Sequence, residues 1–167
     1  MKLIKQRVLF SREECELIIW DTTAEITNWT MKDRKYNSHS INYSLKNKWL
    51  FDKLKDFFEL ESGLELVKNK NEIHFHKFVK DSWFGKHNDA RDSRVYAVGV
   101  LLNEDFDGGD FKLYNPNELV LDKILGNTYI FDVDITHEIL PIKSGERFSL
   151  LWFLEGDNVK IKVKNLI

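Results

Sequence analysis

The sequence predicts a mainly β fold with N-terminal helices, arranged as a sandwich or jelly roll. Apolar residues recur at helical spacing before Gly63, and the period changes to two after it. Turn signals then follow at close intervals, as short antiparallel strands require. They stand at Asp107-Gly108-Gly109, Asn115-Pro116, Gly126-Asn127 and Lys143-Ser144-Gly145-Glu146.

Two helices are expected in the N-terminal part. Ser11 and Glu14 form a capping-box pattern, and Cys15, Ile18 and Ile19 follow at helical spacing, which predicts a helix from about Arg12 to Ala24. A second apolar stripe runs between Asn47 and Glu61 and stops at Ser62-Gly63. The stripe consists of Leu50, Leu54, Phe57 and Phe58.

Nine strands are predicted after the second helix. They are Leu64 to Val67, Glu72 to Val79, Arg94 to Asn103, Asp110 to Tyr114, Glu118 to Leu121, Thr128 to Asp132, His137 to Ile142, Arg147 to Leu154 and Val159 to Val163. The 167 residues suit a single domain, 1–167, with a helical support region at 1–70 and a β core at 71–167.

Composition points away from partners that bind through net charge. The 25 Lys+Arg nearly balance the 27 Asp+Glu, so neither nucleic acid nor an anionic membrane is an expected partner. Cys15 is the single cysteine, which excludes an internal disulfide and favours a reducing compartment. No secretory leader and no run of about eighteen apolar residues is found, so the expected location is cytoplasmic.

The strongest chemical motif is His87-Asn88-Asp89. In an extended segment the imidazole and the carboxylate project from one face, which suits two ligands of one ion. Fe(II) held by two His and one carboxylate keeps other positions open for co-substrate and O2. The competing interpretation of the motif is a solvated turn.

A second group of candidates lies downstream. His137 follows a predicted strand, and Arg147 begins the next one across a Ser-Gly turn, so both could face one cavity. A guanidinium grips a carboxylate through two parallel hydrogen bonds, and Ser149, on the same strand face, could add a third. Alternatively, Arg147 forms a surface ion pair and Ser149 bonds to the backbone.

Two further segments contain candidate functional residues. His74-Phe75-His76 could supply two cupin-type metal ligands, although Asp81 is the nearest following acid; alternatively, these side chains face inward with Phe78, and His76 touches substrate. The polar and aromatic stretch from Trp29 to Tyr43 reads as a long loop, either a connector or a substrate-capture segment using Trp29 and Tyr36.

From Glu72 to Leu154 the chain resembles 2-oxoglutarate and Fe(II)-dependent oxygenases, most nearly the prolyl 4-hydroxylase branch. The resemblance rests on an ordered set of short pieces. They are Lys86 to Asp89, Val98 to Asn103, Asp107 to Asp110, Gly126 to Phe131, His137 to Ile142 and Ser144 to Leu150.

The resemblance implies a double-stranded β-helix (jelly-roll) core. It also implies that His87, Asp89 and His137 bind Fe(II) and that Arg147 binds the distal carboxylate of 2-oxoglutarate. Two tyrosines typical of prolyl hydroxylases are replaced, by Phe78 and Leu101. Ser149 is expected to take over part of their hydrogen bonding.

The function expected from the resemblance is a dioxygenase that uses O2 and 2-oxoglutarate to hydroxylate a peptidyl, prolyl-type side chain, releasing succinate and CO2. Two alternatives stay open. One is hydroxylation of a free amino acid or small metabolite on the same core, and the other is a non-catalytic metal-binding jelly-roll module. The four predicted metal and anion residues favour catalysis, because a binding module has no need of Arg147 beside the metal.

Overall fold

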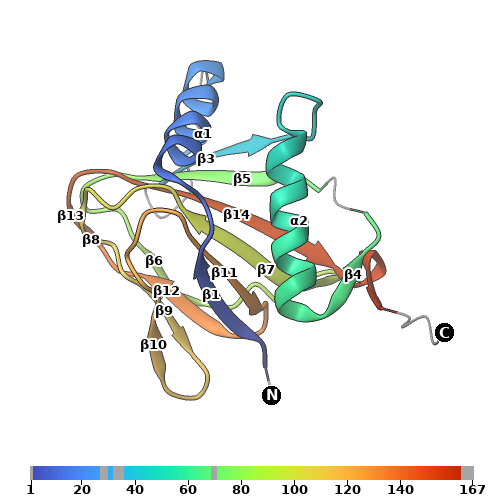
Figure 1. Cartoon of the computed structure of the whole chain (residues 1–167). Helices are drawn as coiled ribbons and strands as arrows, with labels where there is room; N and C mark the ends of the chain where they lie inside the picture. The colour runs from blue at the N-terminus through green and yellow to red at the C-terminus, as the bar shows by residue number, and fades with distance from the viewer. Residues whose placement is uncertain (1, 27–29, 32–35, 69–70, 163–167) are drawn as a thin grey trace.

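The computed structural model describes residues 2–26, 30–31, 36–68 and 71–162. Strands dominate this part of the chain, with two α-helices and one short 3-10 helix, so the predicted mainly β class is confirmed (Figure 1). The helices are α1 (Arg12–Glu25), α2 (Lys48–Ser62) and η1 (Gly156–Asn158). None of the helices in the described ranges is long and apolar enough to cross a bilayer.

The strands form two main antiparallel sheets. The larger one has the order β1 (Ile4–Val8), β11 (Asn127–Asp132), β7 (Arg94–Leu101), β14 (Arg147–Glu155), β5 (Ile73–Phe78), β3 (Tyr36–Ile41) and β2 (Thr30–Met31). The smaller one has the order β10 (Glu118–Val120), β9 (Phe111–Tyr114), β12 (Thr136–Ile139) and β6 (Phe84–His87). Two two-stranded sheets complete the fold: β13 (Ile142–Ser144) pairs with β8 (Asp107–Gly108), and β15 (Val159–Ile161) pairs with β4 (Leu64–Leu66).

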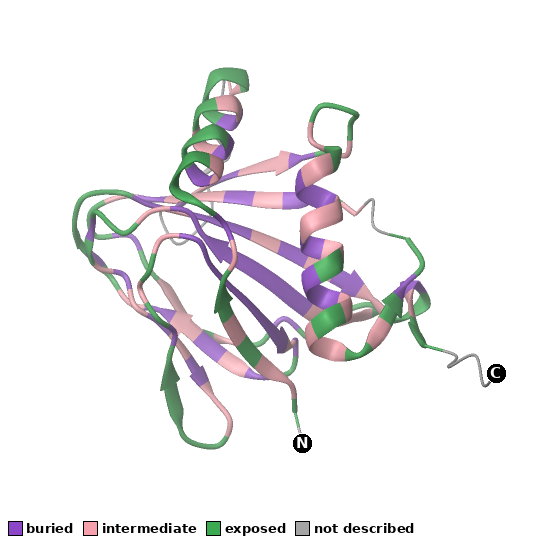
Figure 2. Cartoon of the chain, in the orientation of Figure 1, coloured by how far each residue is buried: buried purple, intermediate pink, exposed green. Residues whose placement is uncertain are grey.

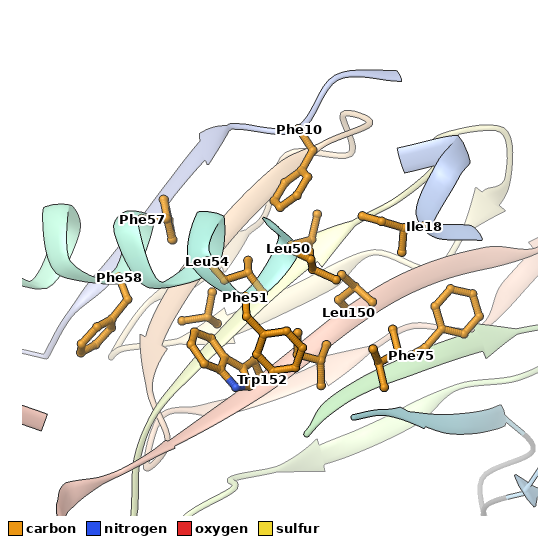
Figure 3. Packing of buried hydrophobic residues seen from close by; sticks show 14 of the residues in the cluster. Phe10, Ile18, Leu50, Phe51, Leu54, Phe57, Phe58, Phe75, Leu150 and Trp152 are labelled. Atoms are coloured by element: carbon orange, nitrogen blue, oxygen red, sulfur yellow. The ribbon is translucent and has the colours of Figure 1, made fainter. Parts of the chain in front are cut away.

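Alternate side chains of the central strands point to opposite faces of the larger sheet, and each face contributes to a separate hydrophobic core. On β14, Leu150 and Trp152 face the helices, whereas Ser149 and Leu151 face the smaller sheet. The helix-side core packs α2 on the larger sheet through Leu50, Phe51 and Leu54, with Phe51 edge-on to Trp152 at 6.2 Å (Figure 3). Figure 2 shows the middle strands of the larger sheet as buried along most of their length.

Both helices begin and end close to the predicted boundaries. The Ser11 hydroxyl accepts a hydrogen bond from the Glu14 amide, and the Glu14 carboxylate accepts one from the Ser11 amide, which completes the capping box. Helix α2 ends at Gly63, whose φ of 71° is left-handed and suits glycine.

Several predictions about strands were wrong. The stretch expected to be a loop between Trp29 and Tyr43 contains β3, because its backbone pairs with β5 in a sheet that the polarity of the local sequence does not reveal. The segment from His137 to Ile142 is two strands separated by a break at Leu140-Pro141. Strands β1, β2, β6 and β8 were not predicted, and the end of the last predicted strand, Val163, lies outside the described residues.

Cys15 offers a test of the helix-side core. Its side chain is buried between α1 and the sheet, and burial raises the pKa of the thiol to about 11. At pH 8 we expect a thiol reagent to label native protein at least about 100-fold more slowly than urea-unfolded protein, because thiolate is the reactive form. Since the folded pKa exceeds the unfolded one, this burial stabilises the fold below about pH 9 and loses that effect as pH rises through 11. Equal labelling rates for native and unfolded protein would contradict this packing.

Candidate active site

Three metal-ligand side chains meet at one end of the smaller sheet. His87 ends β6 and His137 lies on β12, and the two are direct partners in the strand register. Asp89 follows β6, where its amide donates to the Val133 carbonyl at 2.8 Å. One potential ligand atom from each residue lies within 4.8 Å of the others, so the pairing of β6 with β12 builds the group.

The tautomers of the two histidines fit a metal site. Nδ1 of His87 lies 2.6 Å from the Gly85 carbonyl, and Nδ1 of His137 lies 2.9 Å from the Ile135 carbonyl. A carbonyl only accepts, so each Nδ1 carries a proton, and in a neutral ring Nε2 presents a lone pair. Those Nε2 atoms stand 3.4 and 3.1 Å from the Asp89 carboxylate. Three acceptors facing one point need a cation between them.

Asp89 itself supports this conclusion. It is 5% exposed, and its Oδ2 atom accepts no hydrogen bond. Burial raises the pKa of Asp89, but the neighbouring His137 and His87 outweigh this and hold the pKa well below its usual range. The group is therefore an ionised carboxylate with two imidazoles, the donor set that suits Fe(II) with open coordination positions.

Arg147 is a buried cation on the facing sheet. Its side chain is 3% exposed, Nη1 donates to Ser149 Oγ at 3.0 Å, and Nε has no hydrogen-bond partner. Within the described ranges, no carboxylate lies within 4.0 Å of its guanidinium. Burial lowers the pKa of Arg147, although Tyr129 counteracts this. A buried guanidinium without a counter-ion has the chemistry to pair with a carboxylate from outside the chain.

Tyr129 is a neighbour of Arg147 that the sequence did not reveal. The Tyr129 hydroxyl lies close enough to the guanidinium to raise the pKa of Arg147, and because a guanidinium has no acceptor, the Tyr129 O–H proton stays available to another acceptor. Burial raises the pKa of Tyr129, so the hydroxyl stays protonated at neutral pH. Its strand partner is Gly99, where an added Cβ would lie 2.2 Å from the Tyr129 ring. Gly99 lies inside a predicted strand, and a glycine at such a position indicates that a neighbouring group packs closely against the strand.

The metal-ligand group and Arg147 do not line the same cavity, contrary to expectation. The three ligands line a pocket of about 200 Å³, whereas Arg147 and Tyr129 line a separate space of about 10 Å³, enough for a single water. Phe111 lines both spaces, with its ring centroid 5.5 Å from that of His137 and 5.2 Å from that of Tyr129. Phe111 is thus a wall residue shared by the metal-ligand pocket and the space beside Arg147.

The larger pocket gathers some of the predicted substrate residues. Tyr36 and His76 both line it, and the Tyr36 ring stacks on Phe78 at 4.8 Å with 8° between the planes. Trp29 lies outside the described residues. His74 lines the pocket as well. Neither His74 nor His76 belongs to the one metal-ligand group found in the described part of the chain, so cupin-type ligation is not supported.

The family described as the 2OG-Fe(II) oxygenase superfamily matches residues 73–155, which include the metal-ligand group, Arg147 and Ser149. The chain belongs to the 2OG-Fe(II) oxygenase superfamily. Its members use Fe(II), 2-oxoglutarate and O2, and the predicted family is confirmed. A comparison with curated proteins gives no significant match.

Solved structures share the fold of this oxygenase. A Pseudomonas putida prolyl-4-hydroxylase is 18% identical, with a TM-score of 0.74 over 91% of this chain and 92% of its own. A Trichoplax adhaerens prolyl hydroxylase in complex with a hypoxia inducible factor peptide fragment is 15% identical, with a TM-score of 0.70 over 94% and 84%. The viral collagen prolyl hydroxylase of Paramecium Bursaria Chlorella virus-1 is 14% identical, with a TM-score of 0.70 over 96% of both chains.

The residues that replace the two tyrosines lie next to Arg147 and Ser149 in this oxygenase. Phe78 is the strand partner of Arg147, and Leu101 is the strand partner of Ser149. Neither side chain has a hydrogen-bonding group, and both are buried. Around Arg147 the hydroxyls come instead from Tyr129 and Ser149.

Substituting Tyr129→Phe tests this arrangement. Losing one hydroxyl beside a charged pair is expected to weaken 2-oxoglutarate binding by roughly 5- to 10-fold. Affinity for the metal should stay within about 2-fold, because the phenyl ring keeps the packing against Phe111. Anaerobic titration of the metal-loaded protein with 2-oxoglutarate measures the first quantity, and calorimetry with Mn(II) the second. Unchanged 2-oxoglutarate affinity would show that the Tyr129 hydroxyl does not contact the co-substrate.

Proposed function

We propose that this chain, as one domain, is a 2-oxoglutarate- and Fe(II)-dependent dioxygenase that hydroxylates a peptidyl, prolyl-type side chain. His87, Asp89 and His137 would hold the iron, and Arg147 with Ser149 and Tyr129 would hold the distal carboxylate of 2-oxoglutarate. One observation carries the proposal: three metal-ligand side chains converge on one sheet, and the facing sheet holds a buried guanidinium that forms no ion pair within the described residues.

When bound, iron, 2-oxoglutarate and O2 would supply the oxidising chemistry, with succinate and CO2 as products. The protein contributes position and shielding. The Gly85 and Ile135 carbonyls fix the two imidazoles, and the buried Asp89 keeps its charge where the metal binds. Phe111 and Phe84 cover the group, since their ring centroids lie 5.5 Å from His137 and 3.8 Å from His87 respectively.

The pocket wall supports a prolyl-type substrate. Aromatic rings of Tyr36, Phe78, Phe84, Phe111 and Phe153 line the same space as the metal ligands. Such a wall suits an apolar saturated ring as the group that is hydroxylated. The solved structures of similar fold include a prolyl hydroxylase bound to a peptide fragment, which supports a peptide as substrate.

A free amino acid or small metabolite is the second candidate. The pocket volume of about 200 Å³ favours it, because that space is small for a peptide to enter beyond one side chain.

The decisive experiment for the proposed chemistry combines binding and turnover. Anaerobic protein with Fe(II) and 2-oxoglutarate should develop the weak visible charge-transfer band of the chelated metal. On exposure to O2 it should release succinate, and proline-containing peptides should accelerate this more than free L-proline. Absence of both the band and succinate would leave only a metal-binding jelly-roll module.

A further inference from the structure

Two arginines share the pocket of the metal ligands. Arg91 lies in the connection between β6 and β7, and Arg94 begins β7; both line the space of about 200 Å³ that contains His87, Asp89 and His137. Neither guanidinium forms an ion pair with a carboxylate of the part of the chain that the structure describes. They are therefore positive charges at the substrate pocket that the proposed iron and 2-oxoglutarate sites do not use.

The position of Arg94 is fixed without neutralising its charge. Its guanidinium carbon lies 3.8 Å from the centroid of the Phe153 ring, which also lines the pocket. Stacking on an aromatic face restrains a guanidinium while its N–H groups stay available for a carboxylate. A backbone hydrogen bond of 3.3 Å from the Arg94 amide to the Arg91 carbonyl keeps the two residues in one turn.

Nearby acids do not cancel these charges. Asp92 is exposed in the same turn, and Glu155 is the strand partner of Arg94, yet neither forms an ion pair with it. Glu72 lies 3.8 Å from His74 instead. Asp89 is the one carboxylate among the residues that line the pocket, and it faces the two imidazoles. Iron would compensate Asp89 and the bound co-substrate, so the two arginines would remain as net positive charge.

We infer that Arg91 and Arg94 bind a carboxylate that the substrate carries close to the hydroxylated carbon. The carboxylate has two possible sources: the α-carboxylate of a free amino acid or chain end, and the side chain of an acidic residue beside a prolyl-type residue in a peptide. The inference rests on the proposed function for the reaction itself. The preference for an anion does not depend on turnover.

Matched acid and amide ligands test the inference. N-acetylproline and N-acetylprolinamide probe an α-carboxylate, and acetyl-Pro-Glu-amide and acetyl-Pro-Gln-amide probe an acidic neighbour. Ligand-observed NMR on protein loaded with Zn(II) and 2-oxoglutarate should show at least about 10-fold tighter binding of the acid in one of the two pairs. The pair that shows the preference identifies the source of the carboxylate.

Variants connect the preference to these residues. Arg91→Gln/Arg94→Gln should bring the acid and amide of the preferred pair within about 2-fold of each other. Arg12→Gln, which removes an arginine of α1 that pairs with Glu104 and lies outside the pocket, should keep the wild-type preference. Circular dichroism and Zn(II) affinity establish that the variants are folded.

Equal binding of acid and amide in both pairs by the wild type would overturn the inference, as would a preference that survives the double substitution. A missing charge-transfer band with Fe(II) and 2-oxoglutarate would instead contradict the proposed function. The NMR measurement uses no turnover, so the two failures are distinguishable.

Discussion

The His87→Ala variant is expected to lose metal binding and turnover together. The substitution removes one of three ligands and leaves Asp89 with a single neighbouring imidazole. Because loss of a residue that merely orients a ligand costs about 10- to 100-fold in metal affinity, loss of the ligand should cost at least about 100-fold. Mn(II) calorimetry and succinate release from 2-oxoglutarate under O2 measure the two effects.

His39→Ala is the matched control for that variant. His39 lies on β3 and lines a different cavity, between α1 and α2, so its loss should change metal affinity by less than about 2-fold. The side chain of His87 is partly exposed at the pocket, and its removal leaves both cores intact. Wild-type Mn(II) affinity in His87→Ala would show that the ion binds elsewhere.

The Arg147→Gln variant is expected to lose 2-oxoglutarate while it keeps the metal. The buried guanidinium has an Nε without a hydrogen-bond partner and no counter-ion in the described part of the chain, which is why we propose that it pairs with the distal carboxylate of 2-oxoglutarate. Truncating one partner of a buried charged pair costs about 2–5 kcal/mol, which corresponds to roughly 30-fold or more in affinity. Anaerobic titration with 2-oxoglutarate measures this loss, and Mn(II) affinity should stay within about 3-fold.

Co-substrate analogues separate a binding role of Arg147 from a structural one. Wild-type protein should bind 2-oxoglutarate much more tightly than 2-oxopentanoate, which lacks the distal carboxylate, and Arg147→Gln should bind both equally. Arg147→Lys keeps the charge but not the planar fork, so an intermediate preference is expected. If the glutamine variant still discriminates between the two acids, the distal carboxylate binds another group.

Much of the fold follows from local patterns. The capping box at Ser11 and the apolar stripe from Leu50 to Phe58 define the two helices within one or two residues. Central strands such as β7 and β14 were predictable because their side chains are buried in alternation or continuously. Strand β3 was not, since its polar residues derive their order from pairing with β5 rather than from their own propensity.

The sequence also predicted part of the candidate site. His87, Asp89, His137 and Arg147 were found from residue types whose chemistry is distinctive at a given spacing. Tyr129, Phe111 and the two pocket arginines were not, because tyrosine, phenylalanine and arginine occur commonly in cores and on surfaces. These residues belong to the site because of tertiary packing. Strands β11 and β9 bring Tyr129 and Phe111 close to β14, and the connection between β6 and β7 brings the two arginines close to Phe153.

The sequence by itself determined the mainly β class, both helices and the four residues expected to bind iron and co-substrate. Only the tertiary structure decided that His87 and His137 are strand partners and that Phe111 lines both the metal pocket and the space beside Arg147. Local spacing fixes which face of a strand a side chain occupies. Distances between strands far apart in the chain depend on register and packing, which no single segment encodes.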